Sequence, residues 1–129
     1  MSSQDVISSF WSAMQANDWT HAASHLAPEC AVDWPCSGEQ IVGRDNFAAV
    51  QARYPTNTGR WSFDVHRLVA GDDTVVSEVT VTDGEQSARV IVFAEVVDDH
   101  IARQVEYWPM PYDPPAGRED LTRPIERIP

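Results

Sequence analysis

The second half of the chain alternates apolar and polar residues with a period of two, and this pattern constrains the fold more than any other feature. Four runs show it, at residues 60–70, 74–82, 87–97 and 100–108, for example "TVVSEVTVT" and "SARVIVFAEVV". A period of two is typical of β-strands with one buried face. Because the connections between the runs are as short as "GDD" and "DD", consecutive strands have to pair antiparallel. The pattern predicts a four-stranded meander.

The first half of the chain has helical spacing instead. Apolar residues that recur at three- and four-residue intervals predict helices at 3–16, about 19–27 and about 44–53. Between the second and third helix, the apolar run "CAVDWP" predicts a short strand that Pro35 ends. The order is then helix, helix, strand, helix and four strands. Helices that cover one face of such a sheet make an α+β domain.

A single domain spanning residues 1–129 is expected, because a chain of this length builds one core. Residues 109–129 form a proline-rich C-terminal tail with six of the nine prolines. Prolines at this density exclude a long helix or strand. We expect the tail to lie along the surface of the domain.

Charge and composition exclude several classes of partner and cofactor. The net charge of −11 argues against nucleic acids and anionic membranes, because both are bound through a basic surface. All nine basic residues are arginine, which excludes Schiff-base chemistry and a phosphate-loop lysine. Cys30 and Cys36 fit no metal-binding spacing. We therefore expect two reduced thiols and neither a metal nor an organic cofactor.

We expect neither a signal peptide nor a membrane-spanning segment. The segment "MSSQDVISSF" has neither the basic region nor the long apolar stretch of a signal peptide. No apolar run is long enough to span a bilayer. A cytoplasmic location is the default expectation.

Three segments together carry a resemblance to a known superfamily. They are "FWSAMQANDWTHAASHLAPECAVDWP", "IVGRDNFAAV" and "FAEVVDDHIARQVEYW". In this order they resemble the nuclear-transport-factor-2-like superfamily, in particular its SnoaL-like branch of polyketide-cyclase-like and ketosteroid-isomerase-like proteins. The resemblance covers about residues 3–108. It implies a cone-shaped, curved, mixed or antiparallel sheet covered by three N-terminal helices around a cavity, and a homodimer formed through the outer sheet face.

The resemblance does not extend to the known catalytic residues of these enzymes. The oxyanion-hole tyrosine, the aspartate base and the protonated aspartate of ketosteroid isomerase fall on Phe10, Trp34 and Val92, which are all apolar. Asp33 is one residue from the base position, and on a regular strand its side chain turns to the opposite face. The acid of SnoaL-like cyclases falls on Pro109. This argues against isomerase chemistry of that type and puts cyclase chemistry in doubt.

The last predicted strand offers one acid–base candidate. The alternation puts Gln104, Glu106 and Trp108 on one face, and the resemblance implies that this face lines the cavity. A carboxyl group among aromatic rings such as Trp34 has a raised pKa, which suits a general acid or base near neutral pH. The alternatives are a structural ion pair between Glu106 and an arginine such as Arg89, and a role for Glu106 in anchoring a ligand.

The predicted site is an apolar pocket for a small hydrophobic molecule. We expect Glu106 to be catalytic. We expect the ligand to contact Trp11, Trp34, Gln104, Trp108 and His66. His66 also fits a structural role in its strand. Two functions stay open. One is a cofactor-independent isomerase, dehydratase or cyclase, and the other is a non-catalytic binding protein for an apolar ligand. A third interpretation is an interaction domain that uses its acidic surface.

Overall fold

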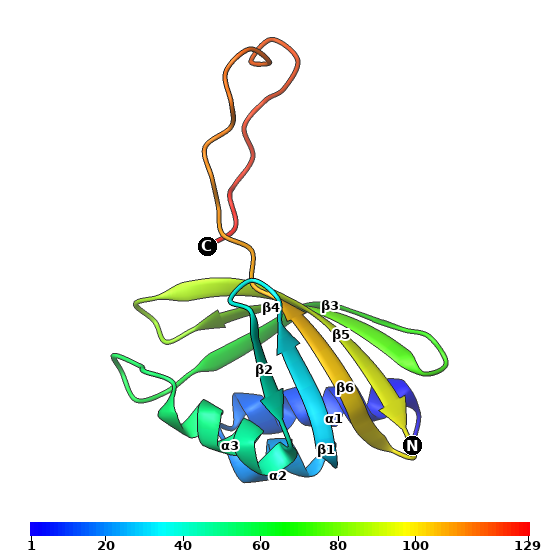
Figure 1. The fold of residues 1–129 in the computed structure, drawn as a ribbon. Coiled ribbons are helices and arrows are strands. Elements are labelled where there is room, and N and C mark those ends of the chain that lie inside the picture. Colours follow the sequence, from blue (N-terminus) through cyan, green and yellow to red (C-terminus); the bar gives the residue numbers. More distant parts are fainter.

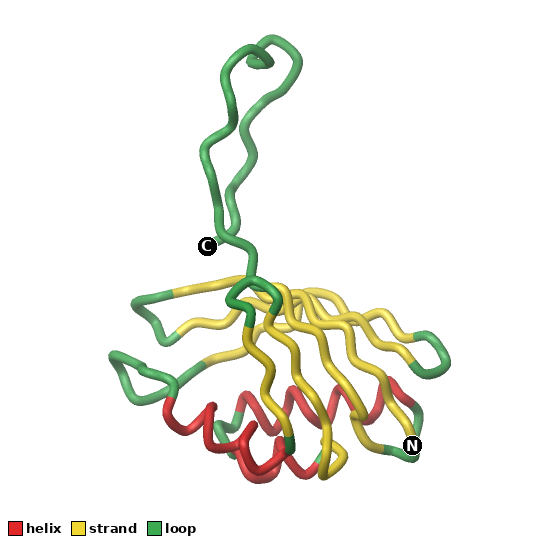
Figure 2. Tube along the Cα trace, in the orientation of Figure 1, coloured by secondary structure: helices red, strands yellow, loops and turns green.

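Six strands form one curved sheet, and three helices pack against one face of it. A computed structural model covers residues 1–129. The helices are α1 (Ser3–Gln15), α2 (Trp19–Ser24) and α3 (Arg44–Arg53), and the strands are β1 (Leu26–Trp34), β2 (Glu39–Val42), β3 (Ser62–Ala70), β4 (Thr74–Thr82), β5 (Ser87–Val97) and β6 (His100–Tyr107). All three helices lie on the same side of the sheet (Figures 1 and 2). This confirms the α+β class and the cone-shaped sheet covered by N-terminal helices.

The sheet is mixed, with the strand order β2-β1-β6-β5-β4-β3. Strands β3 to β6 pair antiparallel in sequence order, as predicted for the meander. Strand β1 lies parallel to β6, and β2 pairs antiparallel with β1 at the sheet edge. Because parallel strands end at the same edge of a sheet, the last residues of β1 lie beside the last residues of β6. The register that pairs Asp33 with Val105 sets this arrangement.

The predicted bounds of α3, β4 and β5 agree with the structure, whereas the region between α2 and α3 differs. Helix α2 ends at Ser24, and β1 begins at Leu26, before the predicted start at Cys30. Pro28 is tolerated in β1 because the pairing with β6 is irregular between Leu26 and Ala31. Strand β2 was not predicted. Its four residues have only Ile41 buried, which is too short a pattern to show a period of two.

The core lies between the helices and the concave sheet face. Helix α1 buries an apolar stripe that includes Val6, Ile7 and Phe10, each at most 1% exposed. Opposite this stripe, alternate residues of β4 and β5 such as Val79 and Val92 are equally buried. These contacts hold α1 against the sheet through the hydrophobic effect. None of the helices has the length and hydropathy needed to cross a membrane.

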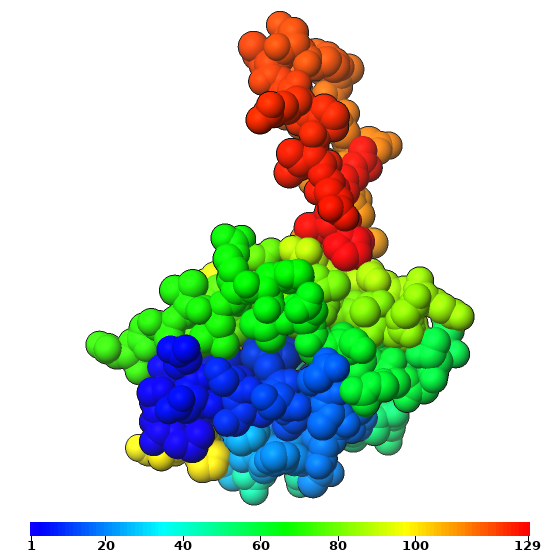
Figure 3. Space-filling view, turned by 180° about the vertical axis from the view of Figure 1, so that it is seen from behind, coloured from blue at the N-terminus to red at the C-terminus, as the bar shows by residue number.

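The proline-rich tail projects away from the domain (Figures 1 and 3). The prediction that it lies along the surface is wrong. Its outgoing and returning segments are joined by an ion pair in which Arg127 Nη1 lies 2.9 Å from Asp113 Oδ1. The apolar side chains of the tail are left exposed, with Leu121 at 82% and Ile125 at 85%. The prolines of the tail, beginning with Pro109, prevent it from extending the sheet.

Candidate active site

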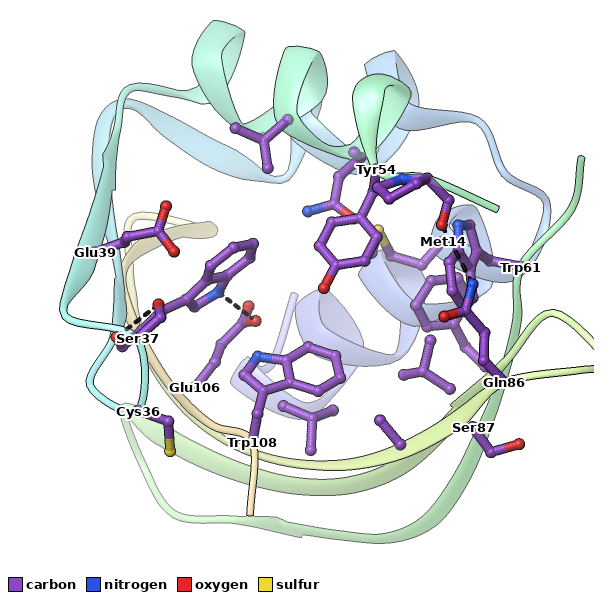
Figure 4. Close-up of a pocket in the computed structure, with 18 of the residues that line it drawn as sticks. Met14, Cys36, Ser37, Glu39, Tyr54, Trp61, Gln86, Ser87, Glu106 and Trp108 are labelled. Atoms are coloured by element: carbon purple, nitrogen blue, oxygen red, sulfur yellow. Dashed lines mark hydrogen bonds between the residues drawn. The ribbon is translucent and has the colours of Figure 1, made fainter. Parts of the chain in front are cut away.

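A cavity of about 540 Å³ opens between α3, the concave sheet face and the segment that connects α3 to β3. This volume is typical of sites for small molecules. Six aromatic side chains line it, namely Trp11, Trp34, Tyr54, Trp61, Phe63 and Trp108. Figure 4 shows Glu106 and Trp108 directed into the same space that Tyr54 enters from the α3 side. The cavity wall is therefore mainly apolar and rich in aromatic rings, and it contains a carboxyl group.

The carboxyl group of Glu106 is held by hydrogen bonds from two neighbouring side chains. The parallel pairing of β1 and β6 brings Trp34 beside Glu106, and Trp34 Nε1 donates to Glu106 Oε1 at 2.9 Å. Gln104 Nε2 donates to Glu106 Oε2 at 3.3 Å. Glu106 is 6% exposed and Gln104 is 1% exposed. Gln104 therefore binds the carboxyl group but does not line the cavity. The expectation that Gln104 contacts the ligand is wrong.

Burial dominates the electrostatics of this carboxyl group. Desolvation raises the pKa of Glu106 from 4.5 to about 7, while the hydrogen bond from the Trp34 indole and the nearby Trp108 indole act in the opposite direction. On β1, burial and the nearby charge of Glu106 raise the pKa of the Cys30 thiol to about 12. At neutral pH the thiol is protonated, and the carboxyl group is divided between its two forms. Glu106 can therefore accept or donate a proton in this pH range.

An ion pair between Glu106 and Arg89 is absent, so this alternative is wrong. Arg89 Nη1 lies 2.6 Å from Glu78 Oε2, and Arg67 Nε lies 2.7 Å from Glu78 Oε1. Glu78 and Arg89 belong to the outer sheet face, since the residues that alternate with them are buried against the helices. Asp33 also pairs outside the cavity, with Arg103 Nη2 at 2.6 Å from its Oδ2. No ion pair in the structure includes Glu106.

His66 does not line the cavity, so the expectation that it contacts the ligand is wrong. Its Nε2 atom lies 2.6 Å from Thr80 Oγ1, on the outer face. Strand β3 alternates from Phe63, which lines the cavity, as far as the bulge between Val65 and Arg67. His66, three residues after Phe63, therefore faces the opposite side of the sheet. Trp11 does line the cavity with its ring, while its Nε1 atom donates to Ser77 Oγ at 3.1 Å.

Three aromatic residues of the cavity, Tyr54, Trp61 and Phe63, were not predicted to contact the ligand. Tyr54 caps the C-terminus of α3, and its hydroxyl points into the cavity toward Trp108 (Figure 4). Its ring packs at 80° to that of Trp34 and at 75° to that of Trp61. The Trp61 Nε1 atom is buried without a hydrogen-bond partner. The sequence indicates only that Tyr54 ends a helix before Pro55, which says nothing about the direction of its side chain.

No group of three or more histidine, cysteine or acidic residues is placed to hold a metal ion. The side chains on the cavity wall can instead bind an organic molecule, exclude water from it and exchange a proton with it through Glu106.

Comparison with known proteins agrees with the fold. The family model of the SnoaL-like domain matches residues 7–104. A crystal structure from Kribbella flavida, provisionally named a ketosteroid isomerase, is 30% identical, with 98% of this chain and 90% of that chain covered and a TM-score of 0.86. An NTF-2-like protein of unknown function from Burkholderia xenovorans is 21% identical, with 96% and 95% covered and a TM-score of 0.78.

An LEH-like epoxide hydrolase from M. tuberculosis shares the fold as well. It is 22% identical, with 83% of this chain and 82% of that chain covered and a TM-score of 0.66. No curated protein sequence matches the chain. The match of the family model to most of the domain, together with the curved sheet and its helices, establishes that the chain belongs to the SnoaL-like domain family.

Proposed function

We propose that the protein is a cofactor-independent enzyme that transfers a proton on a small, largely apolar molecule, with Glu106 as general acid or base. One observation carries this proposal. Glu106 is a buried carboxyl group without a cationic partner, in the wall of an aromatic cavity, and its pKa is about 7. A group that titrates near the working pH is the most effective acid–base catalyst. Such pKa values concentrate at functional sites.

One carboxyl group is enough for an isomerisation. The carboxylate takes a proton from one carbon of the substrate, and the resulting carboxylic acid returns a proton to another carbon. Glu106 then ends the cycle in the form in which it began, and no external acid or reductant is needed. Dehydration and cyclisation use the same group, first as base and then as acid. The aromatic walls hold the substrate beside the carboxyl group, which supplies the proximity that such a transfer needs.

Hydrogen–deuterium exchange tests this proposal without knowledge of the product. A panel of small neutral and cationic carbon acids is incubated with the protein in D₂O, and loss of the carbon-bound proton is followed by NMR. We expect catalysed exchange of at least one compound, and we expect Glu106→Gln to abolish it. Glu95→Gln is the matched control, because Glu95 is exposed on β5, outside the cavity. Equal exchange by Glu106→Gln and the unmodified protein would eliminate Glu106 as the acid or base.

The second candidate is a non-catalytic binding protein for an apolar ligand. It is favoured by the absence of the ketosteroid isomerase residues, since Phe10, Trp34 and Val92 stand at those positions. This function predicts no exchange above the rate in buffer for any compound. It also predicts that Trp34→Ala weakens ligand binding strongly, while Glu106→Gln changes it only modestly.

We also propose that two copies of the chain pair through the outer face of the sheet. An apolar row crosses four strands on this face, because Val69 pairs with Val76, Val76 with Phe93, and Phe93 with Val105. Phe93 is 43% exposed, and its ring lies 6.1 Å from that of Tyr107. An exposed apolar surface of this kind is typical of protein–protein interfaces, and a two-fold axis brings the same row of a second copy against it.

A further inference from the structure

The cavity contains a buried carboxyl group whose negative charge no protein cation balances. Glu106 is in no ion pair. The only arginine on the cavity wall is Arg53, which is exposed at the mouth together with the second carboxylate, Glu39. A carboxylate in apolar surroundings is unfavourable unless it gains a proton or a positive partner. The site is therefore complementary to a ligand that brings a positive charge.

The walls of the cavity are suited to an organic cation. Tyr54 packs nearly perpendicular to both Trp34 and Trp61, so the rings present π-faces in more than one direction. Tryptophan faces attract cations more strongly than other aromatic side chains do. A primary ammonium group needs several hydrogen-bond acceptors, and the tryptophan rings beside Glu106 offer none. A nitrogen that carries three carbon substituents needs one hydrogen-bond acceptor, and a nitrogen that carries four needs none. Its carbon substituents pack against the aromatic rings.

The charge of the whole molecule favours the same ligand class. The net charge is −11, and the chain contains no lysine. A protein with this excess of negative charge attracts cations and repels anions. The long-range field, the aromatic walls and the unbalanced carboxyl group thus favour the same sign of ligand charge.

We propose that the cavity binds an organic cation, a tertiary or quaternary ammonium compound with an apolar body, whose nitrogen lies between the tryptophan rings and the carboxylate of Glu106. This inference rests on the same cavity as the proposed enzyme and names the class of its substrate. The positive charge acidifies neighbouring C–H bonds and holds Glu106 in its ionised form, which is the form that accepts a proton.

Cation binding is coupled to a proton, because Glu106 has a pKa of about 7 in the free protein. The other ionisable groups around the cavity are Cys30 on β1, Cys36 in the turn between β1 and β2, Tyr54 and Arg53 at the end of α3, and Glu39 on β2. The residue paired with Glu106 on β5 is Val92, and the α1 residues on the wall are apolar. Below the pKa of Glu106 a cation has to displace a proton, so its affinity falls as the pH is lowered.

A pair of molecules with the same shape and different charge tests the proposal. Phenyltrimethylammonium and its neutral isostere tert-butylbenzene are titrated against the protein, and tryptophan fluorescence is followed at pH 8 and pH 6. At pH 8 we expect the cation to bind at least about tenfold more tightly than the isostere. Its affinity should fall about tenfold between pH 8 and pH 6, whereas that of the isostere should stay constant. Calorimetry in two buffers at pH 7 should show the release of about half a proton per bound cation.

Two variants assign the effect to a residue. We expect Glu106→Gln to lose most of the preference for the cation and all of the pH dependence of that preference. The matched control Glu39→Gln, which removes the carboxylate at the mouth, should keep the preference and its pH dependence. Equal binding of both molecules by the unmodified protein at pH 8 would overturn the cation assignment and leave the proposed acid–base function intact. Loss of the preference in Glu39→Gln but not in Glu106→Gln would also overturn it. If neither molecule bound, both the ligand class and the cavity assignment would fail.

Discussion

Replacement of Glu106 by glutamine should make the stability of the protein less dependent on pH. Glutamine has the shape of the protonated carboxyl group, and its amide oxygen can still accept from Trp34 Nε1. The pKa of Glu106 is 4.5 in the unfolded chain and about 7 in the folded protein. Between these values the folded protein binds more protons than the unfolded chain, so the free energy of unfolding falls as the pH rises. This loss is absent below pH 4.5 and complete above about pH 7.

The size of the effect follows from the same two pKa values. A tenfold change in proton affinity is worth ~1.4 kcal/mol, so the rise from 4.5 to about 7 corresponds to roughly 3 kcal/mol. The free energy of unfolding of Glu106→Gln minus that of the unmodified protein should therefore grow by about this amount between pH 4.5 and pH 8. Carboxyl groups with lowered pKa values, such as Asp33 and Glu78, lose stabilisation as the pH falls. They do so in both proteins, so their contributions cancel in the difference.

Urea denaturation followed by tryptophan fluorescence measures this difference. Both proteins are unfolded at one protein concentration and at several pH values from 4.5 to 8. The exposed-site variant Glu95→Gln should show a difference that stays constant with pH. A constant difference for Glu106→Gln as well would refute the reasoning, because it would mean that folding does not change the proton affinity of Glu106. A difference that shrinks with rising pH would show that the pKa is lowered by a partner that the structure does not contain.

Two further predictions concern the rest of the molecule. Phe93→Glu places a charge in the apolar row of the outer sheet face, which we propose as the dimer interface. Light scattering should therefore show a dimer for the unmodified protein and a monomer for Phe93→Glu. A dimeric Phe93→Glu, or a monomeric unmodified protein, would show that this row is not an interface. Asp83 accepts hydrogen bonds from the backbone N–H groups of Asn57 and Gln86, which hold its pKa far below the usual range. Asp83→Ala should therefore lower the melting temperature more than the control Asp72→Ala does. The difference in melting temperature between the two variants should become smaller at acid pH, because a group with a lowered pKa stabilises the fold only while its carboxylate is ionised. A difference that is the same at pH 3 and pH 7 would contradict this.

The sequence predicts the strands and helices well where a buried face repeats over many residues. The period of two in β4 and β5 gives their bounds, and the same alternation places Glu106 on the inner face of β6. Strand β2 is not predicted from the sequence, because it has four residues at the sheet edge and buries only one side chain. The direction of the tail is not predicted either, because its prolines exclude helix and strand but do not determine whether the tail follows the surface or projects from it.

The site is predicted less completely than the fold, because its contacts join distant segments. That Trp34 donates to Glu106 depends on the parallel pairing of β1 with β6 and on its register, which no local pattern encodes. Tyr54 and Trp61 enter the cavity from the connection between α3 and β3, where the side-chain directions follow neither helical nor strand periodicity. The prediction that His66 contacts the ligand is wrong for a different reason. Counting along β3 from Phe63 to His66 already places His66 on the outer face.

Direct titration of the Glu106 carboxyl group is the measurement closest to the central claim. The side-chain carboxyl carbons are labelled with ¹³C, Glu106→Gln identifies the resonance, and its chemical shift is followed from pH 3 to pH 9. We predict a midpoint near pH 7, because the group is buried without a cationic partner, and a lower midpoint when phenyltrimethylammonium is added. A midpoint at or below 4.5 in the free protein would show that the carboxyl group is solvated or paired, and it would contradict the site proposed around Glu106.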